Sequence, residues 1–180
     1  MNWILIGPRG VGKSKVSRAL AKMTGMTLLS TDMIASYELG GTSIASFVAK
    51  NGGDWKEFRD LEKQILTKLK SADNSVLDCG GGILFGIDRE GNEIFDSEKA
   101  DLLRSMGEVV LLEKDLEELV RKVQGDATRP SLSQIDSYRS ILQRRLPYYR
   151  KACHHQMKVD GLSKEEVVQA ILQLPMPRKP

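Results

Sequence analysis

The segment Gly7–Ser14, with the sequence GPRGVGKS, constrains the fold of this chain more than any other feature. It matches the pattern GxxxxGK(S/T) in full, follows an apolar run at 2–6 and precedes residues 13–23, whose apolar side chains recur at helical spacing. Glycines let successive backbone N–H groups turn inward around phosphate oxygens, and the start of the next helix adds the positive end of its dipole. A buried strand, this loop and a helix therefore predict a nucleotide-binding P-loop.

Nucleotide contacts are expected all along this loop. Lys13 can reach the β- and γ-phosphates, and the Ser14 hydroxyl can bind Mg²⁺. The predicted nucleotide-binding residues of the loop are Gly7, Pro8, Arg9, Gly10, Val11, Gly12, Lys13, Ser14 and Lys15. The motif indicates that a nucleotide binds but does not show what becomes of it.

Short apolar strands alternate with helices along the rest of the chain. We expect strands at 27–29, 75–77, 108–112 and 156–159, and helices at 33–39, 44–51, 54–70, 97–106, 115–123, 135–152 and 164–174. Asp54 and Ser163 are the expected N-caps of two of them, and Pro147 predicts a kink or break near residue 146. The alternation predicts an α/β fold, a three-layer α/β/α sandwich around a five-stranded parallel sheet, with ligands at the carboxyl ends of the strands.

Length and composition set the class of protein. The 180 residues fit one domain, which we place at 1–174, followed by a flexible tail at 175–180. A net charge of +3 argues against a dedicated nucleic-acid surface but permits basic pockets for an anionic ligand. No apolar run approaches the ~20 residues of a membrane span, and the first apolar run lacks the basic start of a signal peptide. Two cysteines, Cys79 and Cys153, are too few for a disulfide framework, so we expect a cytoplasmic protein without a membrane partner.

Three further features lie where a ligand at the top of the sheet would sit. Asp32 follows the second strand, Arg59 and Glu62 share one helical face, and a triple glycine at 80–82 follows the third strand. Taken alone, Asp32 could be a helix cap, and Arg59 and Glu62 could be a solvated ion pair. Three glycines directly after a buried strand favour a close approach of the backbone to a ligand.

These residues, in this order, resemble the shikimate kinases. The resemblance covers nearly the whole chain and rests on the P-loop, Asp32, Phe58-Arg59-x-x-Glu62, Gly80-Gly81-Gly82, Arg129-Pro130 and Arg145-x-Pro147-x-Tyr149. It implies a P-loop kinase fold with a small mobile lid, and transfer of the ATP γ-phosphoryl group to the 3-hydroxyl of shikimate. ATP and Mg²⁺ are the implied cofactors, shikimate is the implied partner, and the expected state is a monomer.

The resemblance also assigns roles on the acceptor side. It implies that Asp32 contacts shikimate hydroxyls and helps to deprotonate the attacking one, while Arg59 and Arg145 hold the carboxylate through paired hydrogen bonds. The implied substrate-binding residues are Asp32, Arg59, Gly80, Gly81, Gly82 and Arg145, with the helical segment at about 33–70 forming most of that side. Arg144 adjoins Arg145, and only one of the two should face the pocket because helical neighbours point about 100° apart. The register of the proline and the tyrosine favours Arg145.

On the nucleotide side, the resemblance implies a lid at about 124–134. Its Arg129 would close over the ATP phosphates, and Lys122 or Arg121 would lie against adenine. Lys13, Asp32 and Arg129 are then the expected catalytic residues. Lid closure would exclude water, which separates a kinase from an ATPase.

Two departures from the family's usual pattern stand out. The family carries Asp-x-Asp after the second strand, and here the first of these positions is Ser30, so one carboxylate of the magnesium shell is missing. Asp78, at the end of an apolar strand, is the candidate replacement; otherwise it caps a turn or pairs with Lys13. The stretch 85–97 is also longer and more polar than the family leads us to expect. Residues 88–91 predict a surface turn, such as that of a hairpin, with no chemistry assigned.

Other functions remain open from the sequence. Another small polyhydroxy acid such as gluconate could be the acceptor, and a nucleoside monophosphate is less favoured because the lid offers a single well-placed arginine. A GTP switch is suggested by the Asp-x-x-Gly pattern at 78–81, but no Asn-Lys-x-Asp guanine motif accompanies it. A nucleotide-binding pseudoenzyme, inactivated by the change at Ser30, is the remaining alternative.

Overall fold

We describe the protein from a computed structural model, which covers residues 1–124 and 137–175. The strands are β1 (Asn2–Ile6), β2 (Thr27–Ser30), β3 (Ser75–Asp78), β4 (Phe85–Ile87), β5 (Glu93–Phe95), β6 (Glu108–Glu113) and β7 (His155–Lys158). The α-helices are α1 (Lys13–Thr24), α2 (Thr31–Glu38), α3 (Ile44–Lys50), α4 (Lys56–Lys68), α5 (Ser97–Met106), α6 (Leu116–Gln124), α7 (Tyr138–Ala152) and α8 (Lys164–Leu172). A 3₁₀ turn, η1 (Leu69–Ser71), extends α4.

Five strands form a parallel sheet in the order β2-β3-β1-β6-β7. Two of the three inner strands, β1 and β3, consist entirely of buried residues, as expected for strands covered on both faces. The order places β1 in the middle, so the loop that follows it emerges at the centre of the sheet's carboxyl edge. This is the position at which doubly wound sheets bind ligands.

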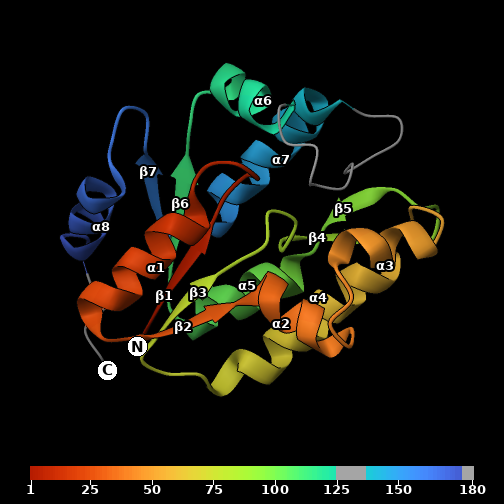
Figure 1. The fold of residues 1–180 in the computed structure, drawn as a ribbon, viewed down its shortest axis with the longest axis horizontal. Helices are drawn as coiled ribbons and strands as arrows, with labels where there is room; N and C mark the ends of the chain where they lie inside the picture. The colour runs from red at the N-terminus through yellow and green to blue at the C-terminus, as the bar shows by residue number, and fades with distance from the viewer. Residues whose placement is uncertain (125–136, 176–180) are drawn as a thin grey trace.

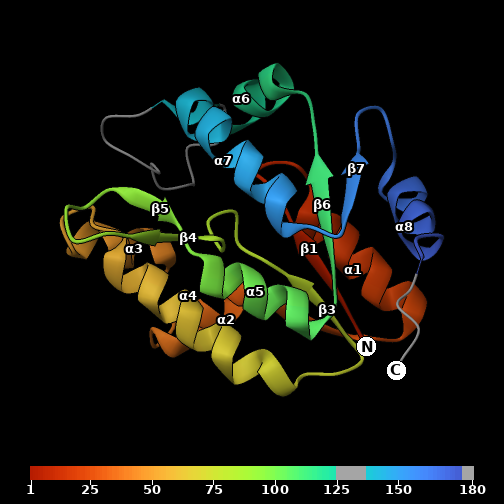
Figure 2. The ribbon, with the colours of Figure 1, turned by 180° about the vertical axis from the view of Figure 1, so that it is seen from behind.

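Helices cover both faces of the sheet. Helices α1 and α8 lie on the near face in Figure 1, and α5 and α7 cover the opposite face in Figure 2. One apolar cluster, around Trp3, Leu20 and Val168, fills the first interface, and another, around Ile4, Leu103 and Tyr149, fills the second. The predicted three-layer α/β/α sandwich with a five-stranded parallel sheet is confirmed.

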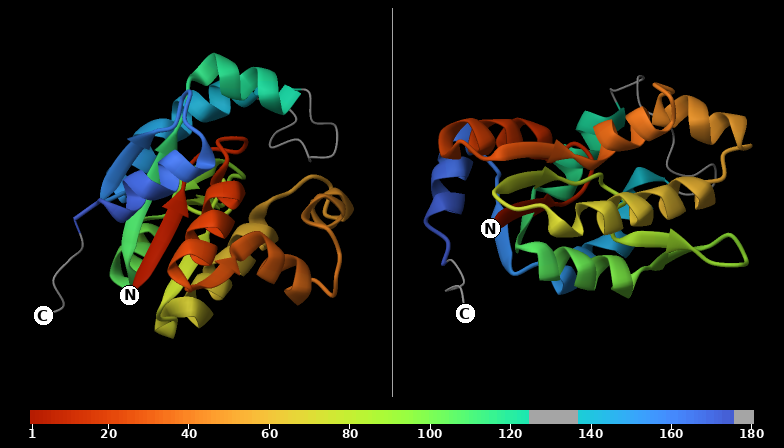
Figure 3. Two further views of the ribbon diagram at one scale, coloured as in Figure 1. Left: turned by 60° about the vertical axis from the view of Figure 1, so that its left-hand side comes forward. Right: turned by 90° about the horizontal axis from the view of Figure 1, so that it is seen from below.

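The helices α2, α3 and α4 lie beside the β2 edge of the sheet, on the side away from α8 (Figure 3). They have a small apolar core of their own, which includes Ala35, Val48, Phe58 and Ile65. This segment places the side chains of α4 next to the carboxyl ends of β2 and β3. Within the described residues, no helix is long and apolar enough to cross a membrane.

Several local expectations are confirmed and others need correction. Ser163 caps α8 in a full capping box with Glu166, and 85–95 forms the hairpin β4–β5. Helix α4 begins at Lys56 rather than at residue 54, because Asp54 uses its carboxylate to accept a hydrogen bond from the Lys56 N–H at 2.8 Å in a turn before the helix. Helix α7 continues through Pro147, so the break that we expected near residue 146 does not occur.

Candidate functional site

A cleft of about 640 Å³ opens at the carboxyl ends of β1, β2 and β3. Its lining combines the P-loop, the start of α1, helix α4 and the glycine loop after β3. The residues that line it are Arg9, Gly10, Gly12, Lys13, Ser14, Lys15, Arg18, Asp32, Ile44, Trp55, Phe58, Arg59, Glu62, Asp78, Cys79, Gly80, Gly81, Gly82, Lys122 and Arg145. The cleft thus gathers most of the predicted site residues from segments far apart in the sequence.

The phosphate loop has a backbone that only glycine adopts readily. Gly7, Gly10 and Gly12 have φ values of 140°, 86° and 108°, and a Cβ on Gly7 would overlap the Leu112 carbonyl. Gly12 is the N-cap of α1 without a side-chain cap, so the first N–H groups of this helix are not capped by its own sequence. Lys13 is buried and donates to the Gly7 and Pro8 carbonyls at 2.8 and 3.0 Å. Its ammonium is therefore held against the backbone of the loop.

Asp32 lies in the first turn of α2, where Ser30 is the N-cap and accepts a hydrogen bond from the Met33 N–H. The neighbouring Thr31 hydroxyl accepts a hydrogen bond from the Gly80 N–H at 2.9 Å and so ties the glycine loop to α2. Asp32 is exposed to solvent through the open cleft, but its carboxyl also lies close against Gly80, where an added Cβ would overlap Oδ1, and this neighbour removes part of its water. This desolvation, followed by the charge of Glu62, raises the pKa of Asp32 and makes it a better proton acceptor than an ordinary aspartate.

Arg59 and Glu62 form a buried pair on α4, with 4% and 2% of their side chains exposed and 2.9 Å between Nη1 and Oε2. Lys99 of α5, 1% exposed, lies 3.4 Å from the same carboxylate and donates to the Phe85 carbonyl at 2.8 Å. Among the described residues, no group accepts a hydrogen bond from the buried Nε of Arg59. A buried guanidinium with a donor still to be satisfied suits an anionic ligand in the cleft.

Arg145 of α7 is 4% exposed and lines the cleft, whereas Arg144 is 42% exposed and lies outside its lining. Nε of Arg145 donates to Glu93 Oε1 at 2.9 Å, Nη2 donates to Glu93 Oε2, and Nη1 donates to the Gly81 carbonyl at 3.3 Å. The Tyr149 hydroxyl donates to the same carbonyl. Two arginines from distant helices, Arg59 and Arg145, therefore face one cleft.

At each position of the triple glycine, a neighbouring group lies so close that it leaves little or no room for a side chain. A Cβ on Gly80 would overlap the Asp32 carboxylate, one on Gly82 would overlap the Arg59 guanidinium, and one on Gly81 would lie 3.2 Å from the Arg9 backbone nitrogen. The glycines thus allow the acceptor-side groups and the phosphate loop to approach the same short segment. Asp78, two residues before Gly80, is buried and lies opposite Ser30 in the β2–β3 register.

The structure brings together most of the predicted site residues, with four exceptions. Gly7, Pro8 and Val11 do not line the cleft; the first two contribute carbonyls to Lys13, and Val11 packs in the apolar core. Arg129 and nearly all of the predicted lid lie outside the described residues. Sequence reasoning missed Lys99 and Glu93. The one signal for Glu93 was the unexpected length of the segment 85–97.

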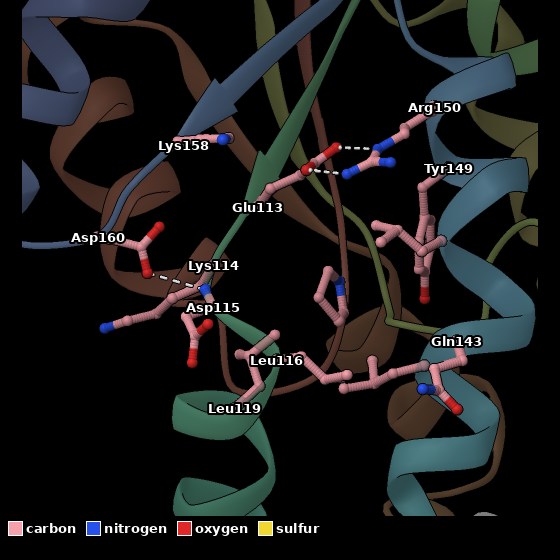
Figure 4. A pocket seen from close by; sticks show the side chains of 13 residues that line it. Glu113, Lys114, Asp115, Leu116, Leu119, Gln143, Tyr149, Arg150, Lys158 and Asp160 are labelled. Carbon is pink, nitrogen blue, oxygen red and sulfur yellow. Dashed lines mark hydrogen bonds and ion pairs between the residues drawn. The ribbon is translucent and has the colours of Figure 1, made fainter.

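A second cavity, of about 450 Å³, lies between α6, α7 and the ends of β6 and β7 (Figure 4). Its floor is mostly apolar, with Leu116 and Leu119 among the lining residues. The Glu113–Arg150 ion pair lies at its edge, with two N–O distances of 2.9 Å. Of the predicted site residues that the structure describes, only Pro8 lines this cavity, so it is separate from the cleft at the P-loop.

A phosphate loop that faces a carboxylate and two buried arginines across one cleft defines a P-loop phosphotransferase with a small anionic acceptor. The comparisons with known proteins refine this class. A family model described as shikimate kinase matches residues 9–175. A shikimate kinase of Leptospira borgpetersenii is 57% identical over 171 residues, which is 95% of this chain and 96% of the relative. Another, of Leptospira biflexa, is 55% identical over 172 residues, or 96% of this chain and 94% of the relative.

The structural comparison gives the same family. The shikimate kinase of Acinetobacter baumannii, solved in complex with shikimate, superposes with a TM-score of 0.78 and 27% identity, covering 96% of this chain and 90% of the other. The chain therefore belongs to the shikimate kinase family. It is an ATP-dependent kinase that phosphorylates shikimate, which decides between the acceptors that the sequence left open.

Proposed function

We propose that the cleft at the P-loop binds both substrates, with ATP on the α1 side and shikimate between α2, α4 and α7. The observation that carries the proposal is the convergence of Asp32, Arg59 and Arg145 on one cleft with Lys13. The chain would act as one kinase domain over 1–174, with the segment 33–70 forming the acceptor side. Both sides of the cleft come from one chain, which supports action as a monomer; a small net charge supports the absence of a nucleic-acid partner, and we propose a cytoplasmic location.

On the nucleotide side, the loop N–H groups and the start of α1 would hold the β- and γ-phosphates, with Lys13 moving from its carbonyl partners to the phosphate oxygens. Lys15 lines the cleft beside them, and Lys122 lines it where adenine would lie. Arg129 stays a prediction for the lid. These groups position the phosphates and neutralise charge, which is most of what phosphoryl transfer asks of a protein.

On the acceptor side, Arg59 and Arg145 would bind the carboxylate of shikimate; Nε of Arg59 is buried and has no acceptor among the described residues. The backbone of Gly80, Gly81 and Gly82 would form the wall beside the ring. Asp32 would accept the proton of the 3-hydroxyl as its oxygen attacks the γ-phosphorus in line, and ADP leaves from the opposite side. The raised pKa of Asp32 favours this proton transfer.

The residues near the P-loop fit a magnesium ion held mainly by phosphates and water. Within the described chain, no group of three or more acidic, histidine or cysteine side chains is arranged to hold a metal ion. Mg²⁺ commonly needs only one or two protein ligands beside the nucleotide, and the Ser14 hydroxyl and the Asp78 carboxylate both line the cleft. When bound, Mg²⁺ would neutralise charge on the β- and γ-oxygens. Ser30 caps α2, so Asp78 is the carboxylate proposed for the metal shell.

The function is tested by ADP release with purified protein, ATP, Mg²⁺ and shikimate, followed by mass analysis of the phosphorylated position. No ADP release with shikimate would contradict the proposal. For the metal shell, Asp78→Asn should raise the magnesium concentration needed for half-maximal rate by roughly tenfold, the scale of an outer-shell change. Asp101→Asn, at an exposed position of α5 outside the cleft lining, is the matched control. An unchanged magnesium optimum in Asp78→Asn would exclude its role while leaving the kinase activity in place.

A further inference from the structure

The hairpin β4–β5 is the longer, polar segment that the sequence left without a role. Its strands pair antiparallel, with Phe85 opposite Phe95 and Ile87 opposite Glu93. The turn is held by the Asp88 N–H, which donates to the Asn92 carbonyl at 2.9 Å, and by the Asp88 carboxylate, which accepts from two backbone N–H groups. A defined turn fixes the register, and the register fixes which β5 side chains face the protein.

Alternation along β5 directs Glu93 and Phe95 toward α7, while Ile94, between them, is 46% exposed. Phe95 stacks on Tyr148, with ring centroids 4.9 Å apart, and Phe85 meets Tyr149 edge to face at 5.7 Å. Residues 145, 148 and 149 share one face of α7 because they are three and four positions apart. The aromatic contacts therefore hold the hairpin against α7 in the position that places Glu93 beside Arg145.

Glu93 is the close partner of Arg145. The two side chains make a bidentate pair, and the Arg145 guanidinium carbon lies 4.8 Å from the centre of the Phe85 ring. Burial alone would raise the pKa of Glu93, but the hydrogen bond and charge of Arg145 outweigh it and lower that pKa, so the carboxylate stays ionised at neutral pH. Arg144 is more distant from Glu93, at 3.6 Å.

The geometry of this pair leaves the cleft side of Arg145 open. A guanidinium has five N–H donors. Glu93 takes the Nε donor and one on Nη2, the Gly81 carbonyl takes one on Nη1, and the Tyr149 hydroxyl is a further hydrogen-bond partner, so these protein groups do not use all five donors. Arg145 lines the cleft and Glu93 does not. The carboxylate thus holds the arginine from outside the cleft rather than filling the acceptor site.

We infer that Glu93 is a positioning residue for acceptor binding, which orients the Arg145 guanidinium so that its side facing the cleft meets the carboxylate of the acceptor. The inference rests on the proposed function, in which Arg145 binds that carboxylate. An arginine held in place loses less side-chain entropy when the acceptor binds than a mobile one would. The hairpin, which lies in a stretch longer than the resemblance leads us to expect, thereby becomes part of acceptor recognition.

The test is steady-state kinetics of Glu93→Gln. Glutamine keeps the shape but turns an NH₂ group toward a guanidinium donor, so the bidentate pair is lost. The shikimate KM should rise roughly tenfold, the lower end for partners that orient a binding side chain, with the ATP KM and kcat within about twofold of the unchanged enzyme. Glu90→Gln, on the exposed turn of the same hairpin, should leave both KM values unchanged. Melting temperatures establish that each variant is folded.

Glu93→Gln is then combined with Arg145→Ala. Because Glu93 acts through Arg145, the shikimate KM of the double variant should equal that of Arg145→Ala alone. An unchanged shikimate KM in folded Glu93→Gln, or the same rise in the Arg145→Ala background, would overturn the positioning role. A lower KM would overturn it too, since Glu93 would then compete with the acceptor. If Arg145→Ala alone has no effect on the shikimate KM, the proposed acceptor contact fails, and the role of Glu93 fails with it.

Discussion

Replacing Gly82 by alanine tests whether the close approach of the glycine loop to Arg59 is what places this arginine. Gly82 lacks the positive φ that would make alanine strained, so the backbone tolerates the change. The added Cβ would, however, overlap the Arg59 guanidinium. The guanidinium must move, and its 2.9 Å hydrogen bond to Glu62 must lengthen or break.

The size of the effect follows from burial. Truncating one partner of a buried, hydrogen-bonded charge pair costs about 2–5 kcal/mol. A displaced guanidinium keeps part of its attraction for the acceptor, so we expect the lower half of that range, about 2–3 kcal/mol of transition-state stabilisation. This corresponds to a loss of roughly 30- to 150-fold in kcat/KM for shikimate, at 1.36 kcal/mol per tenfold. The ATP KM should change by less than about threefold, because Arg59 lies on the acceptor side.

The assay couples ADP release to an optical signal and varies each substrate at saturation of the other. Gly86→Ala is the matched control, since a Cβ there would meet its nearest neighbours, the Asp96 and Ile94 side chains, at 3.8–4.0 Å. This variant should behave like the unchanged enzyme. A normal shikimate KM in Gly82→Ala would refute the placement of Arg59, and equal losses for both substrates would indicate misfolding instead.

Two further variants probe the same cleft. Arg59→Ala should lower kcat/KM for shikimate by at least as much as Gly82→Ala while weakening ATP far less, and equal damage to both substrates would argue against a specific contact. In the unchanged enzyme, kcat/KM for shikimate should fall as the pH is lowered through the raised pKa of Asp32, and this acid limb should be absent from the residual activity of Asp32→Asn. The folded-state pKa of Asp32 lies above its unfolded value of about 3.8, so its ionised form destabilises the native state at neutral pH. Asp32→Asn should therefore raise the melting temperature at pH 7, with a gain that disappears as the pH falls toward the unfolded value; an unchanged melting temperature at both pH values would contradict the pKa shift.

The phosphate loop could be predicted from the sequence because its signals are local. An apolar strand, spaced glycines and an amphipathic helix are each encoded within a few residues, and β1 and the start of α1 fall where the pattern indicates. The facing of Arg145 rather than Arg144 could also be anticipated, since helical periodicity and the following proline and tyrosine set the register. These features depend on backbone geometry that neighbouring residues determine.

The partners of the two arginines could not be predicted in the same way. Glu93 meets Arg145 across 52 positions, and Lys99 meets Glu62 across 37. Such pairings depend on how the hairpin and α5 pack on α7 and α4, which no local pattern specifies. Ser30 gives the converse case. The sequence indicated that a carboxylate was missing there, and the structure gives the residue another task, as the N-cap of α2.

The acceptor side of the cleft carries electrostatic groups that the protein alone leaves incompletely satisfied. Asp32 is desolvated and faces the charge of Glu62, and Nε of Arg59 has no acceptor among the described residues. Both arrangements cost stability, and in the proposed binding mode one ligand that supplies a carboxylate and a hydroxyl would offset that cost. Acceptor binding should therefore stabilise the fold by mass action, and the stabilisation should be lost in Gly82→Ala. The specificity of the site and its cost to folding then have the same origin, because a group that its own chain fully satisfied would gain little from the substrate.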